Sequence, residues 1–347
     1  MSSSSSAPDR HGRLAGAGGS VADEYRALRE ACGLIERSWV AGLEIRGADR
    51  VRFLNGFVTC DVQSLAPGHG TYGFVTQIKG RVIADLVVLK LEDRLWLELQ
   101  EATGEEIAAH LRKYVIADQV GIEPLDATTA LTLIGPRAFE VLGEVEAPPE
   151  GPYGHRRVTL RGHEVLLLRE GELRVPVWTL WTAASMAAAL SEELLRRGEA
   201  QGLRPVGRRA FEILRVEAGR PLFGQDFGPE NFPQELAPGQ AVPLEAVSYT
   251  KGCYLGQEVV ARIHHRGGVR RVLRGLVFAP GISDPTGKQV LCEGREAGVV
   301  TSAVDSPSCG RILGLAILHQ RAAEPGGRVG IEGGGEAEVV ELPFELP

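Results

Sequence analysis

Apolar residues recur along this chain with two different spacings, and these spacings predict its elements. From Tyr25, apolar positions three or four residues apart continue through Leu28, Cys32 and Ile35, which predicts a first helix. Other helices are predicted over 103–114, where Thr103 and Glu106 form a capping box, and over 183–197 and 206–218. Alternating or continuous apolar runs predict strands over 43–46, 72–76, 82–91, 95–99, 131–134, 158–160, 165–168 and 175–178.

After Arg270 the helical spacing stops and only short strand-like runs remain. They cover 273–278, 289–292, 298–303, 313–318 and 339–342, with turn residues between them. This pattern predicts a small C-terminal β-barrel or sandwich. Because strands and helices are mixed upstream without strict alternation, the fold class expected is α+β. We expect a disordered tail over 1–20, two α+β subdomains over 21–150 and 151–270, and the barrel over 271–347.

Composition excludes several classes of protein. The net charge is -7, so no overall basic field attracts nucleic acid, and direct nucleic-acid binding is not expected. No run reaches the ~18 apolar residues of a membrane helix, and the Ser- and Gly-rich N-terminus has no apolar core of a secretory signal. The five cysteines are scattered and odd in number, which argues against disulfides or a zinc site and for a reducing cytoplasm.

Two familiar sequence motifs give little support for a nucleotide or metal site in this chain. Residues 68–73 match the glycine pattern of dinucleotide-binding loops, but a strand-like run follows where that motif needs a helix. His264 and His265 are adjacent, so on a helix they point about 100° apart and do not easily share a metal. The chain also lacks the common serine-hydrolase and zincin motifs, and we expect no metal site.

Residues 251–262 are the most informative stretch. Cys253 follows the cation Lys251 and lies between Gly252 and Gly256, and a helix is predicted from Gln257 onward. A helix N-terminus and a nearby ammonium group both lower the pKa of a thiol, which would make Cys253 reactive. A lone cysteine is more often an inert, buried small residue, so both interpretations stay open on this pattern alone.

Two carboxylates are also candidates for chemistry. Asp85 interrupts the apolar strand 82–91, so it must either be paired in the core or face a cavity. Glu235 lies on a proline-rich loop before the cysteine, where most carboxylates are simply solvated. Basic residues between Arg266 and Arg271 are by default a solvated surface, but they adjoin the cysteine loop and could contact a polyanion.

Together these segments resemble the YgfZ-type folate-binding proteins, which are relatives of the glycine-cleavage T-protein (aminomethyltransferase). The family hallmark K-G-C-Y-x-G-Q-E is complete at residues 251–258. The wider superfamily pattern follows in order over about residues 21–345. It comprises Gly47-Ala48-Asp49-Arg50, Phe53-Leu54-Asn55-Gly56, Thr59-Cys60-Asp61-Val62, Lys79-Gly80-Arg81 with Asp85, Arg215 to Gly219, Pro221, Gly224-Gln225-Asp226, and Pro233-Gln234-Glu235.

The resemblance implies a ring-like arrangement of two α+β parts and a barrel, with tetrahydrofolate in a central cavity. It implies that Glu235 holds the pterin and that basic residues lie near the glutamate tail. The folate-binding residues expected are Asp85, Glu235, Tyr254, Gln257, Glu258, Arg262 and Asn55, and the catalytic residues expected are Cys253, Lys251 and Asp85. The transferases often carry two adjacent aspartates where this chain has Ala84 and Asp85, and they lack the hallmark cysteine.

The function expected is therefore a cytoplasmic, folate-dependent factor for assembly or repair of iron–sulfur clusters, with Cys253 as its functional thiol. Its expected partners are iron–sulfur client enzymes, including radical enzymes that thiolate transfer RNA, and assembly proteins. One alternative is a tetrahydrofolate-dependent aminomethyltransferase or demethylase with Asp85 as the acid/base group. Another is a non-catalytic adaptor that uses folate only for stability.

Overall fold

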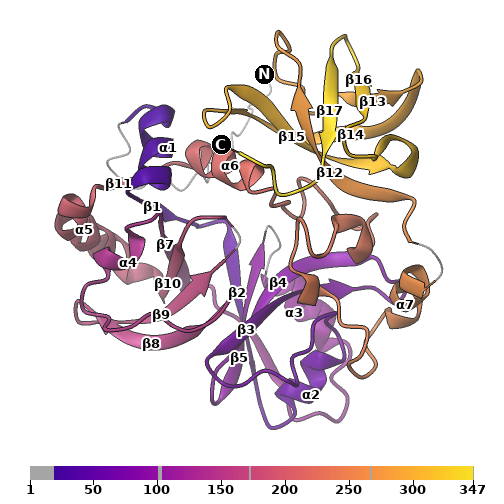
Figure 1. The fold of residues 1–347 in the computed structure, drawn as a ribbon. Helices are drawn as coiled ribbons and strands as arrows, with labels where there is room; N and C mark the ends of the chain where they lie inside the picture. Colours follow the sequence, from indigo (N-terminus) through magenta and orange to yellow (C-terminus); the bar gives the residue numbers. More distant parts are fainter. Residues whose placement is uncertain (1–18, 101–103, 172, 266–267, 347) are drawn as a thin grey trace, which may run out of the picture.

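The computed structural model describes residues 19–100, 104–171, 173–265 and 268–346, which form two sheets and a closed barrel (Figure 1). The five-stranded sheet has the order β3 (His69–Thr76), β4 (Val82–Lys90), β5 (Arg94–Gln100), β2 (Val40–Arg46) and β6 (Gly121–Pro124). The six-stranded sheet has the order β11 (Leu203–Pro205), β1 (Cys32–Glu36), β7 (Thr128–Ile134), β10 (Val177–Ala183), β9 (His163–Glu170) and β8 (His155–Leu160). This arrangement confirms the α+β class.

The C-terminal part is a barrel, one of the two forms that the strand pattern allowed. It closes in the order β12 (Arg271–Phe278), β15 (Arg311–His319), β14 (Arg295–Ser306), β13 (Gln289–Cys292), β16 (Arg328–Ile331) and β17 (Glu336–Val340). The barrel begins at the predicted position. The short strand β16 was not predicted, because its four residues carry too few apolar positions to show a period.

Seven helices and five 3₁₀ turns occur in the described parts of the chain. The helices are α1 (Val21–Glu30), α2 (Arg50–Asn55), α3 (Gly104–Arg112), α4 (Ala138–Val141), α5 (Ala187–Arg197), α6 (Arg208–Glu217) and α7 (Gln257–His265). The 3₁₀ turns are η1 (Ala184–Met186), η2 (Gly198–Gln201), η3 (Pro233–Leu236), η4 (Leu244–Ala246) and η5 (Gln320–Ala322). None of the described helices is long and apolar enough to cross a bilayer. The tail was predicted over 1–20; its residues 1–18, and the predicted cap at Thr103, lie outside the described residues, while Ser20 caps α1.

The first predicted helix is too long. Helix α1 ends at Glu30, and Cys32 begins β1, which pairs with β7 on one side and with β11 on the other. The predicted boundary at residue 150 does not separate the two sheets either, because β1 and β7 pair in the same sheet as β8–β11. The end of α1 and the membership of the second sheet both depend on pairing between strands that are far apart in the sequence. The spacing of apolar residues within one segment cannot predict such pairing.

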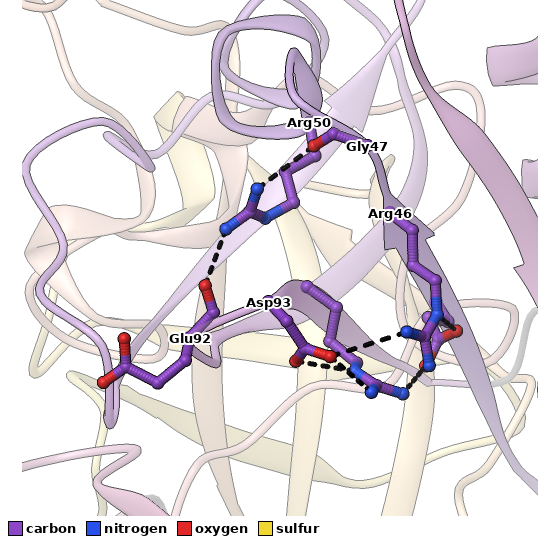
Figure 2. A network of polar contacts seen from close by, with 7 residues as sticks. Arg46, Gly47, Arg50, Glu92 and Asp93 are labelled. Carbon is purple, nitrogen blue, oxygen red and sulfur yellow. Dashed lines mark hydrogen bonds and ion pairs between the residues drawn. The ribbon is translucent and has the colours of Figure 1, made fainter.

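Side chains of the Gly47–Arg50 segment support the fold of the first sheet (Figure 2). The Arg50 guanidinium donates to the Gly47 carbonyl oxygen at 3.1 Å and to the Glu92 carbonyl oxygen at 2.8 Å. Arg46 lies 3.5 Å from the Asp93 carboxylate. These contacts join the turn after β2 to the turn between β4 and β5, so this part of the superfamily pattern has a structural role.

A buried ion pair joins helix α6 to the barrel. The Arg215 guanidinium donates to Asp226 Oδ2 at 2.6 Å, and Asp226 Oδ1 accepts hydrogen bonds of 2.6 Å from the hydroxyls of Thr301 and Ser302. Arg215 and Asp226 are both buried. A single apolar cluster also includes Tyr72 of the first sheet, residues of the second sheet such as Leu168, and barrel residues such as Leu315. The three β-structures therefore share one core.

Candidate functional site

The hallmark loop, residues 251–258, leads into α7, which begins at Gln257 as predicted. Cys253 is exposed, whereas Cys32 and Cys60 are buried. Gly256 has a φ of +88°, and a Cβ there would lie 2.4 Å from the Gln77 carbonyl oxygen. Only glycine allows both this backbone conformation and this close approach to the β3–β4 turn. The thiol is thus presented to solvent from a loop that is held against the first sheet.

Lys251 fastens the hallmark loop to the segment that follows α2. Its ammonium nitrogen donates to the carbonyl oxygens of Asn55 at 2.6 Å, Val58 at 2.6 Å and Cys60 at 2.7 Å. Burial lowers the pKa of Lys251 to about 8, so the group is mainly protonated at neutral pH. These bonds direct its charge toward backbone carbonyls. A direct action of Lys251 on the Cys253 thiol stays a prediction.

The other predicted residues of the loop lie in two different environments. Tyr254 is buried, its ring is 4.9 Å from the Lys251 nitrogen, and its hydroxyl has no hydrogen-bond partner among the described residues. Gln257 accepts a hydrogen bond of 3.3 Å from the Tyr254 backbone N–H. Glu258 and Arg262 instead form an exposed pair on the surface of α7, with 2.6 Å between their charged groups. Contacts of these residues with folate stay predictions.

Asp85 is fully buried on β4. Its Oδ2 accepts a hydrogen bond of 2.8 Å from the Tyr72 hydroxyl and lies 3.9 Å from the Arg220 guanidinium. That guanidinium also stacks over the Tyr72 ring, 4.2 Å from its centre. Sequence analysis missed Tyr72 and Arg220. The signal that could have found Arg220 is its place between Gly219 and Pro221 of the superfamily pattern, where a cation stands between a glycine with a positive φ and a proline.

Ala84 points away from Asp85, because neighbouring strand residues face opposite sides of a sheet. Ala84 packs with Leu86 and Val88 in the cluster on the other face of β4. A carboxylate at position 84 would therefore enter that apolar cluster and not join Asp85. The aspartate that the transferases often carry at this position would therefore lie on the opposite face of β4 from Asp85.

Two cavities are lined by side chains that contact Asp85, although Asp85 itself is buried and lines neither of them. One, of about 500 Å³, is lined by Tyr72, and another, of about 350 Å³, is lined by Arg220. Gly171 and Pro243 line both cavities. Tyr72 and Arg220, which both contact Asp85, therefore line two different cavities that adjoin each other.

Glu235 lies in a different setting from Asp85, and the expectation that both hold the same folate stays a prediction. It is buried in η3, and its Oε2 accepts hydrogen bonds from Asn231 at 2.8 Å and Arg271 at 3.1 Å. It lines a cavity of about 600 Å³ beside the barrel that Asp85 does not line. Across the described ranges, no three His, Cys, Asp or Glu side chains cluster as a metal site would need.

Comparisons with known proteins agree with this architecture. The family described as GCVT N-terminal domain matches residues 10–246, and the one described as glycine cleavage T-protein C-terminal barrel domain matches residues 271–344. Among similar curated proteins, the aminomethyltransferases of Moorella thermoacetica and Geobacillus kaustophilus are each 30% identical over 94% of this chain, covering 89% and 90% of those relatives.

A solved structure, the glycine cleavage system aminomethyltransferase T from Bartonella henselae, is similar in fold. It has a TM-score of 0.83 and 24% identity, and the match covers 94% of this chain and 89% of that chain. The two matched regions together span most of the sequence, in the same order as the sheets and the barrel. The chain belongs to the glycine cleavage T-protein family.

Proposed function

We propose that this protein binds tetrahydrofolate in the two adjoining cavities lined by Tyr72 and Arg220, the side chains that contact the buried Asp85. The buried Asp85 carboxylate can accept hydrogen bonds from ring N–H groups, and the Tyr72 hydroxyl lies beside it. The Arg220 guanidinium supplies a cation that can pair with a carboxylate. This set of groups suits a molecule with an amine-rich ring at one end and an acidic glutamate at the other. When bound, tetrahydrofolate would supply a carrier for a one-carbon unit.

The first candidate activity is support of iron–sulfur cluster assembly or repair, with Cys253 as the functional thiol in a cytoplasmic protein. The observation that carries it is the exposure of Cys253 on a loop fastened by Lys251, within a complete YgfZ-type hallmark. An exposed, held thiol can meet a partner protein, whereas a buried thiol cannot. Its partners would be iron–sulfur client enzymes and assembly proteins.

The second candidate is folate-dependent aminomethyl transfer, and the names of the curated relatives support it more directly. Asp85 would be the acid/base group, because it is a carboxylate buried beside the Tyr72 hydroxyl and the Arg220 guanidinium. Ala84, where the transferases often carry a second aspartate, faces the other side of β4.

Calorimetry with tetrahydrofolate tests the shared part of the proposal. We expect micromolar binding, about 8 kcal/mol, and a loss of at least about tenfold in Asp85→Asn through the changed acceptor. Glu192→Gln, which alters an exposed surface carboxylate on α5, is the matched control and should bind as wild type does. Absence of saturable binding of any reduced folate by wild type would reject the folate site.

Two further measurements separate the activities. Cys253→Ala should fail to complement a strain that lacks this factor if the thiol supports iron–sulfur enzymes, and should complement fully if it does not. Conversion of an aminomethyl-lipoyl partner and tetrahydrofolate into methylene-tetrahydrofolate, ammonia and the dihydrolipoyl partner, abolished by Asp85→Asn but not by Cys253→Ala, would establish aminomethyl transfer. Folate binding without either effect would leave the adaptor interpretation.

A further inference from the structure

A small cavity lies where helices α1 and α6 meet the C-terminal segment of the chain (Figure 1). It shares no lining residue with the cavity of Glu235. Its volume is about 150 Å³, which holds about five water molecules at about 30 Å³ each. The space is therefore too small for a nucleotide or a folate. Arg29, Arg174 and Glu217 bring charges to this cavity, and Leu173, Leu214 and Leu346 form apolar walls.

Glu217 is a buried carboxylate that has no ion-pair partner among the described residues. Its side chain belongs to a residue that is only 2% exposed. Its Oε2 accepts a hydrogen bond of 2.6 Å from the Tyr25 hydroxyl, and its Oε1 accepts one of 2.5 Å from the Ser306 hydroxyl. A carboxylate has about four acceptor positions, so about two stay open toward a ligand. A buried negative charge that only neutral hydroxyls contact is costly unless a cation joins it.

Arg29 is an unpaired cation at the same cavity. It is partly buried in the last turn of α1, and it has no ion pair or hydrogen bond with another described residue. Arg29 and Glu217 both line the cavity, yet they do not form an ion pair with each other. The cavity therefore separates two opposite charges that both lack a partner. A ligand that reaches both groups would satisfy both at once.

Arg174, on the connection between β9 and β10, brings a second cation to the cavity. Its guanidinium donates to the Phe344 carbonyl oxygen at 2.6 Å, which fixes its position and leaves its other N–H groups for a ligand. Two guanidinium groups and one carboxylate leave one positive charge unbalanced at the cavity. A ligand that carries one ammonium group and two carboxylates would balance all three side chains.

We propose that this cavity binds a small acidic amino acid, whose ammonium group pairs with Glu217 and whose two carboxylates pair with Arg29 and Arg174. The planar fork of arginine suits a carboxylate, and an ammonium group offers its donors to the open positions of Glu217. The bound ligand would join α1 and α6 to the connection between β9 and β10. This site does not rest on the proposed folate function. Because Arg174 and Ala218 also line the cavity of Arg220, the test variant is placed at Arg29, which does not line that cavity.

L-Aspartate is the probe, and it is titrated by calorimetry into the full chain. We expect saturable binding, and a weakening of at least about tenfold in Arg29→Gln, because the substitution removes a charged hydrogen-bond donor. Arg26→Gln is the matched control. It alters an exposed arginine of the same helix, which pairs with Asp23 and does not line the cavity, and it should bind L-aspartate as wild type does.

Succinate tests the role of Glu217 in the wild-type protein, without any substitution. It keeps both carboxylates of L-aspartate but lacks the ammonium group, so we expect it to bind at least about tenfold more weakly. This comparison decides the matter if Arg29→Gln proves unstable by circular dichroism. The proposal is overturned if L-aspartate does not saturate at millimolar concentration, or if succinate binds as tightly, which would indicate a simple anion site. It is equally overturned if a folded Arg29→Gln binds L-aspartate as tightly as wild type.

Discussion

The side-chain nitrogen of Lys251 lies 2.6 Å from the carbonyl oxygen of Val58. This hydrogen bond ties the hallmark loop to a segment almost two hundred residues earlier. The same ammonium group also donates to the carbonyls of Asn55 and Cys60, so one side chain satisfies three backbone acceptors that follow α2. Position 251 therefore matters for the shape of the loop before any chemistry at Cys253 is considered.

Removing this ammonium group should destabilise the protein. Lys251→Met keeps the length of the side chain but leaves three backbone carbonyls without their donor, and we expect a loss of about 1–3 kcal/mol in the free energy of unfolding. Urea unfolding followed by circular dichroism measures it. Lys79→Met removes an exposed lysine nearby and should change stability little. Equal stability of the two variants would contradict a fastening role.

The contribution of Lys251 should depend on pH. Burial lowers its pKa from 10.5 to about 8 in the folded protein, so between these values the unfolded chain binds more protons than the folded one. The free energy of unfolding should then rise with pH across this window, relative to Lys251→Met. Urea unfolding of both proteins at pH 8 and pH 10 gives the difference. A difference that falls with pH would mean that the carbonyl hydrogen bonds outweigh burial.

Two glycines of the hallmark should differ sharply in their tolerance of alanine. At Gly256 the φ of +88° and the nearby Gln77 carbonyl both oppose a Cβ, whereas at Gly252 no atom lies within 4 Å of the added carbon. We expect Gly256→Ala to lower the free energy of unfolding by about 1–3 kcal/mol and Gly252→Ala to be nearly neutral. Thermal unfolding of both variants is the measurement. If both were neutral, the loop would be more adaptable than its contacts indicate.

Cys253 should be the cysteine most rapidly alkylated by iodoacetamide near neutral pH. It is exposed, while Cys292 and Cys309 are partly covered and Cys32 and Cys60 are buried. Burial also raises the pKa of Cys32 and of Cys60 to about 12, which keeps both as unreactive thiols. Peptide mass spectrometry over a time course gives the five rates. Faster labelling of Cys292 or Cys309 would show that exposure does not govern reactivity here.

Local patterns in the sequence predicted most of the fold. The strand over 289–292 and the start of α7 at Gln257 match the structure, because apolar spacing and glycine position are local signals. The assignment of Cys32 to a helix failed, since the strand that contains it depends on pairing with residues about a hundred positions away. Short strands such as β6 and β11 were missed for the same reason.

The candidate site was predicted only in part. Asp85 could be selected because a carboxylate within an apolar run must have a partner, but that partner, Tyr72, lies on the neighbouring strand. Glu235 was grouped with Asp85 through the family resemblance; in the structure Glu235 lines a cavity beside the barrel, whereas Asp85 is fully buried behind Tyr72 and Arg220. Side-chain direction on a strand and the packing of one sheet on another decide such groupings, and neither is visible in a linear pattern.

The shared core and the Arg215–Asp226 pair have a consequence for how the protein unfolds. The two matched family regions look like independent modules, but no layer of solvent separates the apolar residues of the sheets from those of the barrel. A fragment that ends before Arg271 would lose the hydroxyl donors of Thr301 and Ser302 and would expose apolar side chains to solvent. The barrel and the sheets should therefore melt in a single cooperative transition, and their amide protons should exchange by one global opening.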